Sequence, residues 1–222
     1  MECTRIYSIH DYAVTFEFAE QISEEVNIQV IALKNFIEQH PFNGFIECVP
    51  AYSSITIYFD KTTDRNKIIE TIKDYNSKLK TQNQQLSEIK IIPVCYELGI
   101  DFSNICTTLN INNDELIQLH SAPTYRVYMI GFTPGFPYMG TVPEVLELPR
   151  KKIPSLNIEA GSVAIAGKQT GIYPRNSPGG WHVIGKTPLK MYDKKRNPAC
   201  FLQAGDLVKF KPISKKEFDQ HQ

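Results

Sequence analysis

The sequence has no long apolar run and no excess of charge. No uninterrupted apolar stretch in the 222 residues approaches the ~20 that a helix needs to cross a bilayer, and the N-terminus lacks the apolar core of a signal peptide. Lysine plus arginine number 24, and so do aspartate plus glutamate. Without net charge the chain has no global field to attract nucleic acid or anionic lipid, so we expect neither nucleic acid nor membrane as a partner.

Cysteine is also scarce. The five cysteines contain no Cys-x-x-Cys pair and are too few for a disulfide scaffold in a chain of this length. No group of histidine, cysteine and carboxylate residues has the spacing of a metal site. These absences predict a reduced, cytoplasmic protein without a metal site of its own.

The first ~85 residues contain alternating strand and helix patterns. Two strand pairs are predicted, at residues 4–9 with 12–18 and at 45–49 with 54–59. Apolar residues at helical spacing follow each pair: Ile22, Val26, Val30, Leu33 and Ile37, then Ile68, Ile72, Tyr75 and Leu79. Two one-sided helices need an apolar sheet face to cover, so the order ββαββα predicts a small α+β sandwich.

A polar stretch at residues 81–88 separates this part from the rest, and we interpret it as a linker. It predicts an N-terminal α+β domain over residues 1–85 and a second domain over residues 86–222.

The second domain is predicted to be mainly β. Residues 89–96 resume as a strand, and two short helices follow, with Asp101 as the N-cap of the first and Asn112 or Asn113 as that of the second. From residue 124 to 210 the pattern is one of strands separated by turns. Such a sheet is expected to close into a barrel or a sandwich, because closure removes exposed edges.

Glycine and proline are concentrated between residues 131 and 193, where they exclude helix and indicate loops of defined shape. Loops of this kind usually carry binding and catalytic residues. Five blocks make up the stretch: Gly131–Tyr138 (GFTPGFPY), Pro149–Pro154 (PRKKIP), Ala160–Gly167 (AGSVAIAG), Gln169–Pro174 (QTGIYP) and Ser177–His182 (SPGGWH).

These blocks in this order resemble the family of the 5-oxoprolinase B subunit, also described as allophanate hydrolase subunit 1-like, which includes the sporulation-kinase inhibitor KipI. The resemblance extends upstream through Pro93–Tyr96, Glu115–Ser121 and Tyr125–Tyr128, and it covers roughly the C-terminal two thirds. It implies a cyclophilin-like barrel for the second domain. It also implies subunits A and C as partners, with ATP and Mg²⁺ as cofactors of the assembled complex.

Three residues of the stretch are candidates for catalysis. Arg150 can hold a carboxylate or phosphate through two hydrogen bonds, whereas its neighbours Lys151 and Lys152 are interpreted as a solvated face. Gln169 offers neutral groups for a lactam or carboxylate, with a simple turn as the alternative. His182 suits acid–base chemistry or ligand orientation, with a structural role as the alternative.

Five further residues are candidates for substrate binding. Phe136 and Tyr138 alternate with prolines and suit the wall of a small apolar pocket, although a structural turn has the same composition. Thr170 and Tyr173 offer hydroxyl groups, and a turn delivers Trp181 to the same rim as the histidine. We expect all five to line one concave site with the three catalytic candidates.

One nucleotide motif is present but lacks its context. Gly180–Thr187 satisfies the P-loop expression Gly-x4-Gly-Lys-Thr, yet residues 181–184 are themselves strand-like and no helical pattern follows. The chain is therefore not expected to hold a complete nucleotide site. The resemblance also leads us to expect an arginine after Pro154, where this sequence has Ser155.

The leading functional hypothesis is a non-autonomous subunit of an ATP-dependent 5-oxoprolinase. The lactam of 5-oxoproline is a stabilised amide, so its hydrolysis requires an activating site with cations and excluded water, which this chain supplies only in part. The alternative is a KipI-like inhibitor that binds a sensor histidine kinase. A prolyl isomerase would rest on the implied fold alone.

Overall fold

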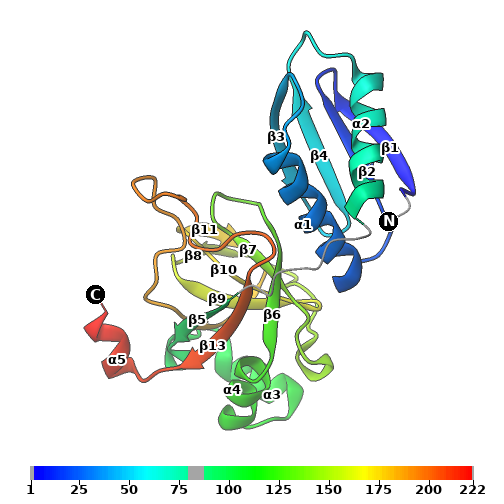
Figure 1. Ribbon diagram of the computed structural model, residues 1–222. Coiled ribbons are helices and arrows are strands. Elements are labelled where there is room, and N and C mark those ends of the chain that lie inside the picture. The colour runs from blue at the N-terminus through cyan, green and yellow to red at the C-terminus, as the bar shows by residue number, and fades with distance from the viewer. Residues whose placement is uncertain (1–2, 80–87, 222) are drawn as a thin grey trace. The chain divides into compact units, whose positions relative to one another are not determined.

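The computed structural model describes residues 3–79 and 88–221 of the chain (Figure 1). It contains two compact units, residues 1–86 and 87–222, each with its own apolar core. Of the predicted linker at 81–88, all but Glu88 lies outside the described residues.

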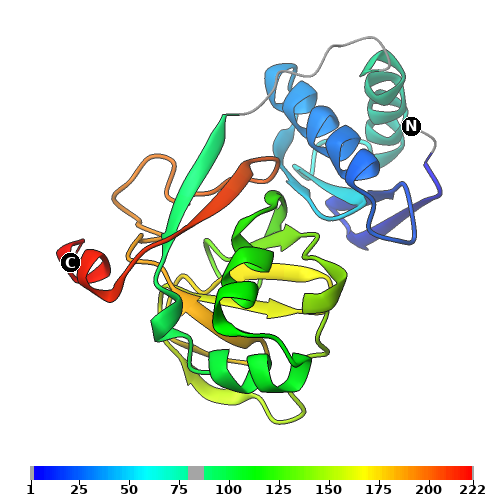
Figure 2. The same ribbon diagram turned by 90° about the horizontal axis from the view of Figure 1, so that it is seen from below.

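The N-terminal unit is a four-stranded antiparallel sheet with two helices on one of its faces (Figure 2). The strand order is β1-β2-β4-β3, and the sequence order ββαββα is the predicted one. The elements are β1 (Arg5–His10), β2 (Ala13–Glu17), α1 (Glu24–Gln39), β3 (Phe45–Pro50), β4 (Ser54–Phe59) and α2 (Arg65–Lys78).

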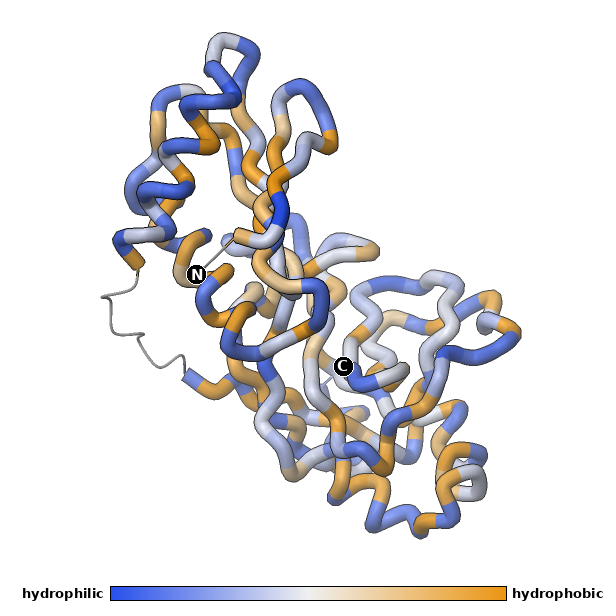
Figure 3. Tube along the Cα trace, turned by 90° about the vertical axis from the view of Figure 1, so that its right-hand side faces the viewer, coloured by the Kyte–Doolittle hydropathy of each residue, from blue (hydrophilic) through white to orange (hydrophobic). Residues whose placement is uncertain are grey.

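The core of this unit lies between the sheet and the helices. Apolar and polar residues alternate along the helices (Figure 3), and the apolar ones pack on alternate residues of the strands, such as Val14, Phe16, Ile55 and Ile57. The prediction was wrong for Ile22, which is exposed and precedes α1. The helix begins after Ser23, whose hydroxyl accepts a hydrogen bond from the Val26 backbone N–H.

The C-terminal unit is built on a seven-stranded sheet of order β12-β9-β10-β7-β6-β13-β5. All neighbours are antiparallel except β13 and β5, which run side by side in parallel (Figure 2). Its strands are β5 (Ile89–Val94), β6 (Thr124–Ile130), β7 (Pro137–Gly140), β9 (Ser162–Ala166), β10 (Gln169–Ile172), β12 (His182–Lys186) and β13 (Leu207–Pro212).

Shorter elements complete this unit. They are η2 (Tyr96–Leu98), α3 (Phe102–Leu109), α4 (Asn113–Ser121), η3 (Glu144–Leu146), α5 (Lys215–Gln220) and a two-stranded ribbon of β8 (Ser155–Ile158) and β11 (Ser177–Gly179). No helix in the described part of the chain is long and apolar enough to span a membrane.

The sheet is curled. Cys95, directly after one edge strand, exchanges two backbone hydrogen bonds with Lys186 of the opposite edge strand, of 2.9 and 3.0 Å. Edges of a flat sheet cannot meet in this way, so the sheet bends round into a half-barrel. The fold is thus of the α+β class that the sequence predicts.

The curled sheet has an apolar core on each face. On β9, Val163 and Ile165 point to the larger core, which α3 and α4 cover, whereas Ala164 and Ala166 point to a smaller one. The smaller core contains most of the aromatic residues that the sequence analysis selected.

Candidate functional site

Four of the predicted substrate-binding residues come together on the face of the smaller core. Phe136 lies at the centre, with its ring centroid 5.2 Å from that of Tyr173 and 5.4 Å from that of Trp181. Tyr138 lies 4.8 Å from Phe136 and 5.8 Å from Trp181. These mostly edge-on contacts are the favoured geometry for aromatic pairs. We call these four residues the aromatic cluster.

Small residues on the strands make room for the cluster. A Cβ atom on Gly171 would lie 2.8 Å from Cζ of Phe136, and one on Gly179 would lie 2.2 Å from the Tyr173 hydroxyl. Both distances are shorter than a real Cβ tolerates, so glycine is required for the rings to reach the backbone. Part of the glycine content of the sequence is thereby explained by ring packing rather than by turns alone.

The cluster is a packed structure more than an open pocket wall. Phe136, Tyr173 and Trp181 are buried, and only Tyr138 is half-buried. Burial raises the pKa of the Tyr173 and Tyr138 hydroxyls, and the positive charge of Arg150 opposes the rise at both. Arg150 itself is exposed, so its guanidinium can reach a ligand at the edge of the cluster.

Gln169 faces the same side as the aromatic cluster. It pairs across the sheet with Ala166 of the smaller core and with Gly140. Residues directly opposite one another on neighbouring strands share a face, so the Gln169 side chain lies on the site side of the sheet.

Thr170, the next residue, lies on the other face, which corrects the prediction that it lines the site. It pairs with Met139 and Ile165 of the larger core and is fully buried. Successive residues of a strand point to opposite faces, so Gln169 and Thr170 cannot both reach one ligand.

Thr170 instead belongs to a buried hydrogen-bond chain beneath the site. Its hydroxyl donates to the Ala164 carbonyl (3.2 Å) and therefore accepts from Nε2 of His120 (2.9 Å). Nδ1 of the same ring then accepts from the Tyr96 hydroxyl (2.7 Å). The His120 ring is fully buried and stacks on Phe210, and burial lowers its pKa from 6.5 to about 3. This hydrogen-bond chain is structural and keeps the His120 ring in its neutral form.

A clamp of short contacts fixes the segment that presents Arg150. The Asp101 carboxylate accepts from the Val183 backbone N–H (2.7 Å) and forms an ion pair of 2.5 Å with Lys151. The side chains of Asp101 and Lys151 are only 18% and 14% exposed. The Lys151 backbone N–H donates to the Gly180 carbonyl (2.8 Å). This segment is therefore tied to β12 and to the start of α3.

The clamp corrects one prediction. Lys151 is a largely buried partner of Asp101 and not part of a solvated face, while Lys152 is exposed as predicted. Asp101 is the N-cap residue of α3, as predicted, although its side chain makes no capping bond and binds Val183 and Lys151 instead. Asn112 is the N-cap of α4, as predicted, and forms a capping box with Glu115.

His182 is joined to the same segment. Nε2 of its half-exposed ring lies 2.9 Å from the Pro149 carbonyl, which can only accept, so Nε2 carries the proton. A ligand would therefore meet His182 through Nδ1. The hydrogen bond ties the His182 ring to Pro149, the residue before Arg150.

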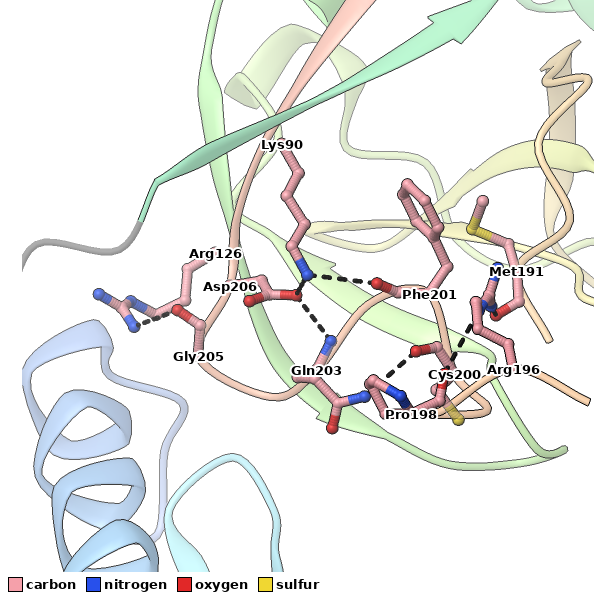
Figure 4. Close-up of polar contacts among 10 residues, drawn as sticks. All are labelled: Lys90, Arg126, Met191, Arg196, Pro198, Cys200, Phe201, Gln203, Gly205 and Asp206. Atoms are coloured by element: carbon pink, nitrogen blue, oxygen red, sulfur yellow. Dashed lines mark hydrogen bonds and ion pairs between the residues drawn. The ribbon is translucent and has the colours of Figure 1, made fainter. Parts of the chain in front are cut away.

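Arg126 is a site-face residue that the sequence analysis did not select. Arg126 lies on β6, opposite Gly140 of β7. Gly140 in turn lies opposite Gln169 of β10, so the three residues form one cross-strand row. Its Nη1 donates to the Gly205 carbonyl (3.2 Å; Figure 4). The sequence contained a signal for Arg126, because it stands between the apolar-facing residues Tyr125 and Val127 of one strand. An arginine inside such a strand must point away from the core that its neighbours fill.

Two cations, Lys90 of β5 and Arg196 of the loop before β13, make contacts that stabilise this loop (Figure 4). Lys90 forms an ion pair with Asp206 (2.7 Å), and the Arg196 guanidinium donates to the carbonyls of Lys190, Met191 and Ala199. These bonds engage Lys90 and Arg196 within the fold. They therefore add no cation to the site face.

Nucleotide and metal motifs are not supported by the described residues. The P-loop-like stretch is strand β12, and its Lys186 pairs with Glu159 rather than starting a helix. Among residues 3–79 and 88–221, no group of three or more His, Cys, Asp or Glu side chains is placed to hold a metal ion.

Known proteins are similar to this chain in sequence and in fold. The family model described as "Carboxyltransferase domain, subdomain C and D" matches residues 4–202. The 5-oxoprolinase B subunit of Bacillus subtilis (strain 168) is 40% identical over 227 residues, covering 96% of this chain and 95% of that protein. The protein of the same name from Haemophilus influenzae is 42% identical, covering 74% and 78%.

The solved structure of TTHA0988 matches 91% of this chain with a TM-score of 0.82 and 35% identity. The match spans only 40% of the TTHA0988 chain, so more than half of that longer chain lies outside it. The near full-length similarity to the Bacillus protein and the family-model match agree with each other. On this evidence the chain belongs to the family of the 5-oxoprolinase B subunit, within the carboxyltransferase domain (subdomain C and D) family.

Proposed function

We propose that this chain is a non-autonomous subunit of an ATP-dependent 5-oxoprolinase, which helps to activate and hydrolyse the lactam of 5-oxoproline to glutamate. The observation that carries the proposal is the 40% identity to a 5-oxoprolinase B subunit over almost the full length of both chains. The exposed Arg150 beside the aromatic cluster and Gln169 on the same face of the sheet support it.

The proposed chemistry divides among the site residues. Arg150 would hold the substrate carboxylate, because a guanidinium binds carboxylates through two parallel hydrogen bonds. Gln169 would donate to or accept from the lactam amide. His182, through Nδ1, would orient the attacking water or accept its proton. Aromatic rings beside these groups would limit access of bulk water.

ATP and Mg²⁺ belong to the assembled complex in this proposal. The described residues do not fit either group on their own, since the P-loop-like stretch is a strand and no cluster of metal ligands is present among them. Lys151 is neutralised by Asp101 and Lys186 by Glu159. Phosphoryl transfer depends on several positioned cations, so we assign these to the partner subunits A and C.

Two finer features complete the proposal. We assign the curled C-terminal sheet to a cyclophilin-like barrel, supported by the meeting of its two edge strands. A cytoplasmic location is supported by the five cysteines, all of which are unpaired thiols.

The test is release of ADP from ATP in the presence of Mg²⁺ and 5-oxoproline. We expect no release by the purified chain alone and substrate-dependent release after subunits A and C are added. Full activity of the chain alone would contradict the non-autonomous role. Inactivity with both partners, together with inhibition of a sensor histidine kinase's autophosphorylation, would favour the KipI-like alternative.

A further inference from the structure

The ring of His120 connects the helices of the C-terminal unit to strand β10. It lies between two hydroxyl groups, accepting from Tyr96 (2.7 Å) and donating to Thr170 (2.9 Å). Tyr96 belongs to η2, His120 to α4 and Thr170 to β10, so three elements meet at one ring. A further bond, from the Tyr125 hydroxyl to the His120 carbonyl (2.8 Å), ties the start of β6 to the end of the same helix.

This polar connection crosses an apolar core. His120 and Thr170 are fully buried, and Tyr96 is almost so. Apolar side chains of the same shape would cost little stability here, because replacing both partners of a buried hydrogen bond by apolar groups is nearly neutral. What a satisfied buried network adds is a fixed distance and direction between the elements that it joins. The connection therefore determines position more than stability.

The strand that it positions carries Gln169. Thr170 follows Gln169 directly, and neighbouring residues of a strand point to opposite faces. The Thr170 hydroxyl is held by His120 and by the Ala164 carbonyl (3.2 Å), while the Gln169 side chain lies on the site side of the sheet. A movement of Thr170 toward or away from α4 is thus passed to Gln169 through a single peptide unit.

Strand pairing alone does not fix β10 in this direction. The strand has four residues, and one of them is Gly171, whose missing Cβ makes room for Phe136. Glycine inside a strand weakens it, since it has no side chain to pack. Backbone bonds of the preceding turn with Leu148 and Val142 hold the strand along the sheet but not against α4. The bond to His120 supplies that restraint.

We infer that His120 is a positioning residue, which fixes β10 relative to the helices through the Thr170 hydroxyl and thereby holds Gln169 at the site. The inference rests on the proposed function, in which Gln169 contacts the lactam amide. His120 itself touches no substrate, because its ring is enclosed in the larger core, where it stacks on Phe210.

The test is a double-mutant cycle on Thr170 and Gln169, measured as 5-oxoproline-dependent ADP release by the chain assembled with subunits A and C. Thr170→Val removes the hydroxyl and keeps the shape of the side chain. We expect it to lower kcat roughly 10–100-fold, as loss of a group that orients a metal ligand does. In the Gln169→Ala background we expect no further loss, since the side chain to be positioned is absent.

The matched control is Thr187→Val. Thr187 is also buried in the C-terminal unit, and its hydroxyl accepts a hydrogen bond from the Leu189 N–H (3.3 Å), which does not involve β10. This variant loses a buried hydroxyl as well, and we expect unchanged ADP release. Thr170→Ser keeps the hydroxyl and should retain most of the activity.

His120 can be tested from its own side with two amides. Glutamine places its amide nitrogen near the position of Nε2 and asparagine near that of Nδ1, so only glutamine can donate to Thr170. We expect kcat of His120→Gln to exceed that of His120→Asn by about 10-fold or more. Equal kcat in the two variants would overturn the inference. This pair decides the question if Thr170→Val does not fold.

Hydrogen exchange of the chain alone distinguishes this inference from the proposed function. Thr170→Val is expected to speed exchange of the β10 amides at least ~10-fold, and Thr187→Val is not. A wild-type complex without ADP release would contradict the proposed function, while faster exchange in β10 would still support the anchor and unchanged exchange would overturn it.

Two outcomes in an active complex would overturn the inference. One is wild-type kcat in Thr170→Val, because Gln169 would then be held without the hydroxyl. The other is an equal loss of kcat from Thr170→Val with and without the Gln169 side chain, which would indicate a general effect on the fold.

Discussion

At the scale of single residues, the difficult question is which face of a strand each side chain occupies. Gln169 and Thr170 are adjacent in a block bounded by glycines, and the sequence suggested that both reach one ligand. The structure places them on opposite faces, because the block is strand β10 and not a turn. Glycines bound turns and short strands alike, so composition alone did not distinguish the two.

His120 gives a prediction for the pH dependence of stability. Its pKa is about 3 in the folded protein and near 6.5 when unfolded, so the unfolded state takes up a proton first as the pH falls. The contribution of the neutral His120 ring to stability is fully present above pH 6.5 and declines below it. We expect the unfolding free energy of the C-terminal unit to fall by about 2 kcal/mol between pH 7.5 and 5.

Urea unfolding followed by the fluorescence of Trp181, the only tryptophan, reports this unit. His182→Gln is the control, because it changes a half-exposed histidine that lies outside the hydrogen-bond chain of His120. An unfolding free energy that stays constant from pH 7.5 to 5 would contradict the prediction.

At the scale of elements, the longer helices could be predicted and the connections between elements could not. Helical spacing located α1 and α2, and the Asn112 cap located α4, since these signals lie within a few residues of one another. The bond between Asp101 and Lys151 joins residues 50 positions apart, and nothing local marks them as partners. Such contacts arise only when the sheet folds.

This pair gives a prediction at the same scale. Lys151→Met removes one partner and leaves the Asp101 carboxylate poorly solvated, so we expect a loss of about 3 kcal/mol in unfolding free energy, the low end for a buried pair. Equilibrium denaturation measures it. Lys152→Met changes the exposed neighbour and should stay within ~0.5 kcal/mol of the wild type. Equal effects of the two substitutions would show that the ion pair has no special role.

At the scale of the whole molecule, the sequence predicted a ββαββα sandwich followed by a mainly β part, and the structure has both. The strand order of the seven-stranded sheet could not be predicted from the sequence, because β5 and β13 pair in parallel although more than 100 residues separate them in the chain. The meeting of Cys95 with Lys186 follows from that order. The aromatic residues selected from the sequence do pack together in the structure, whereas their burial was not predicted.

The division into two domains remains a prediction, for which the two compact units and the polar composition of residues 81–88 provide the motive. Limited trypsin digestion should cut first at Lys80 and leave a stable C-terminal fragment. Mass spectrometry of the fragments over time is the measurement. First cuts inside residues 88–210, or a C-terminal fragment that is degraded as fast as it forms, would contradict a boundary near residue 85.

The buried ring of His120 has a practical consequence. The hydrogen on its Nε2 points to the Thr170 hydroxyl in the core. Both residues are fully buried, so this hydrogen is expected to exchange slowly with deuterium. A slowly exchanging imidazole hydrogen gives its own resonance in a proton NMR spectrum, far from the amide signals. That resonance would report whether the C-terminal unit is intact in every variant proposed above that keeps His120 and Thr170, without knowledge of substrate or partner.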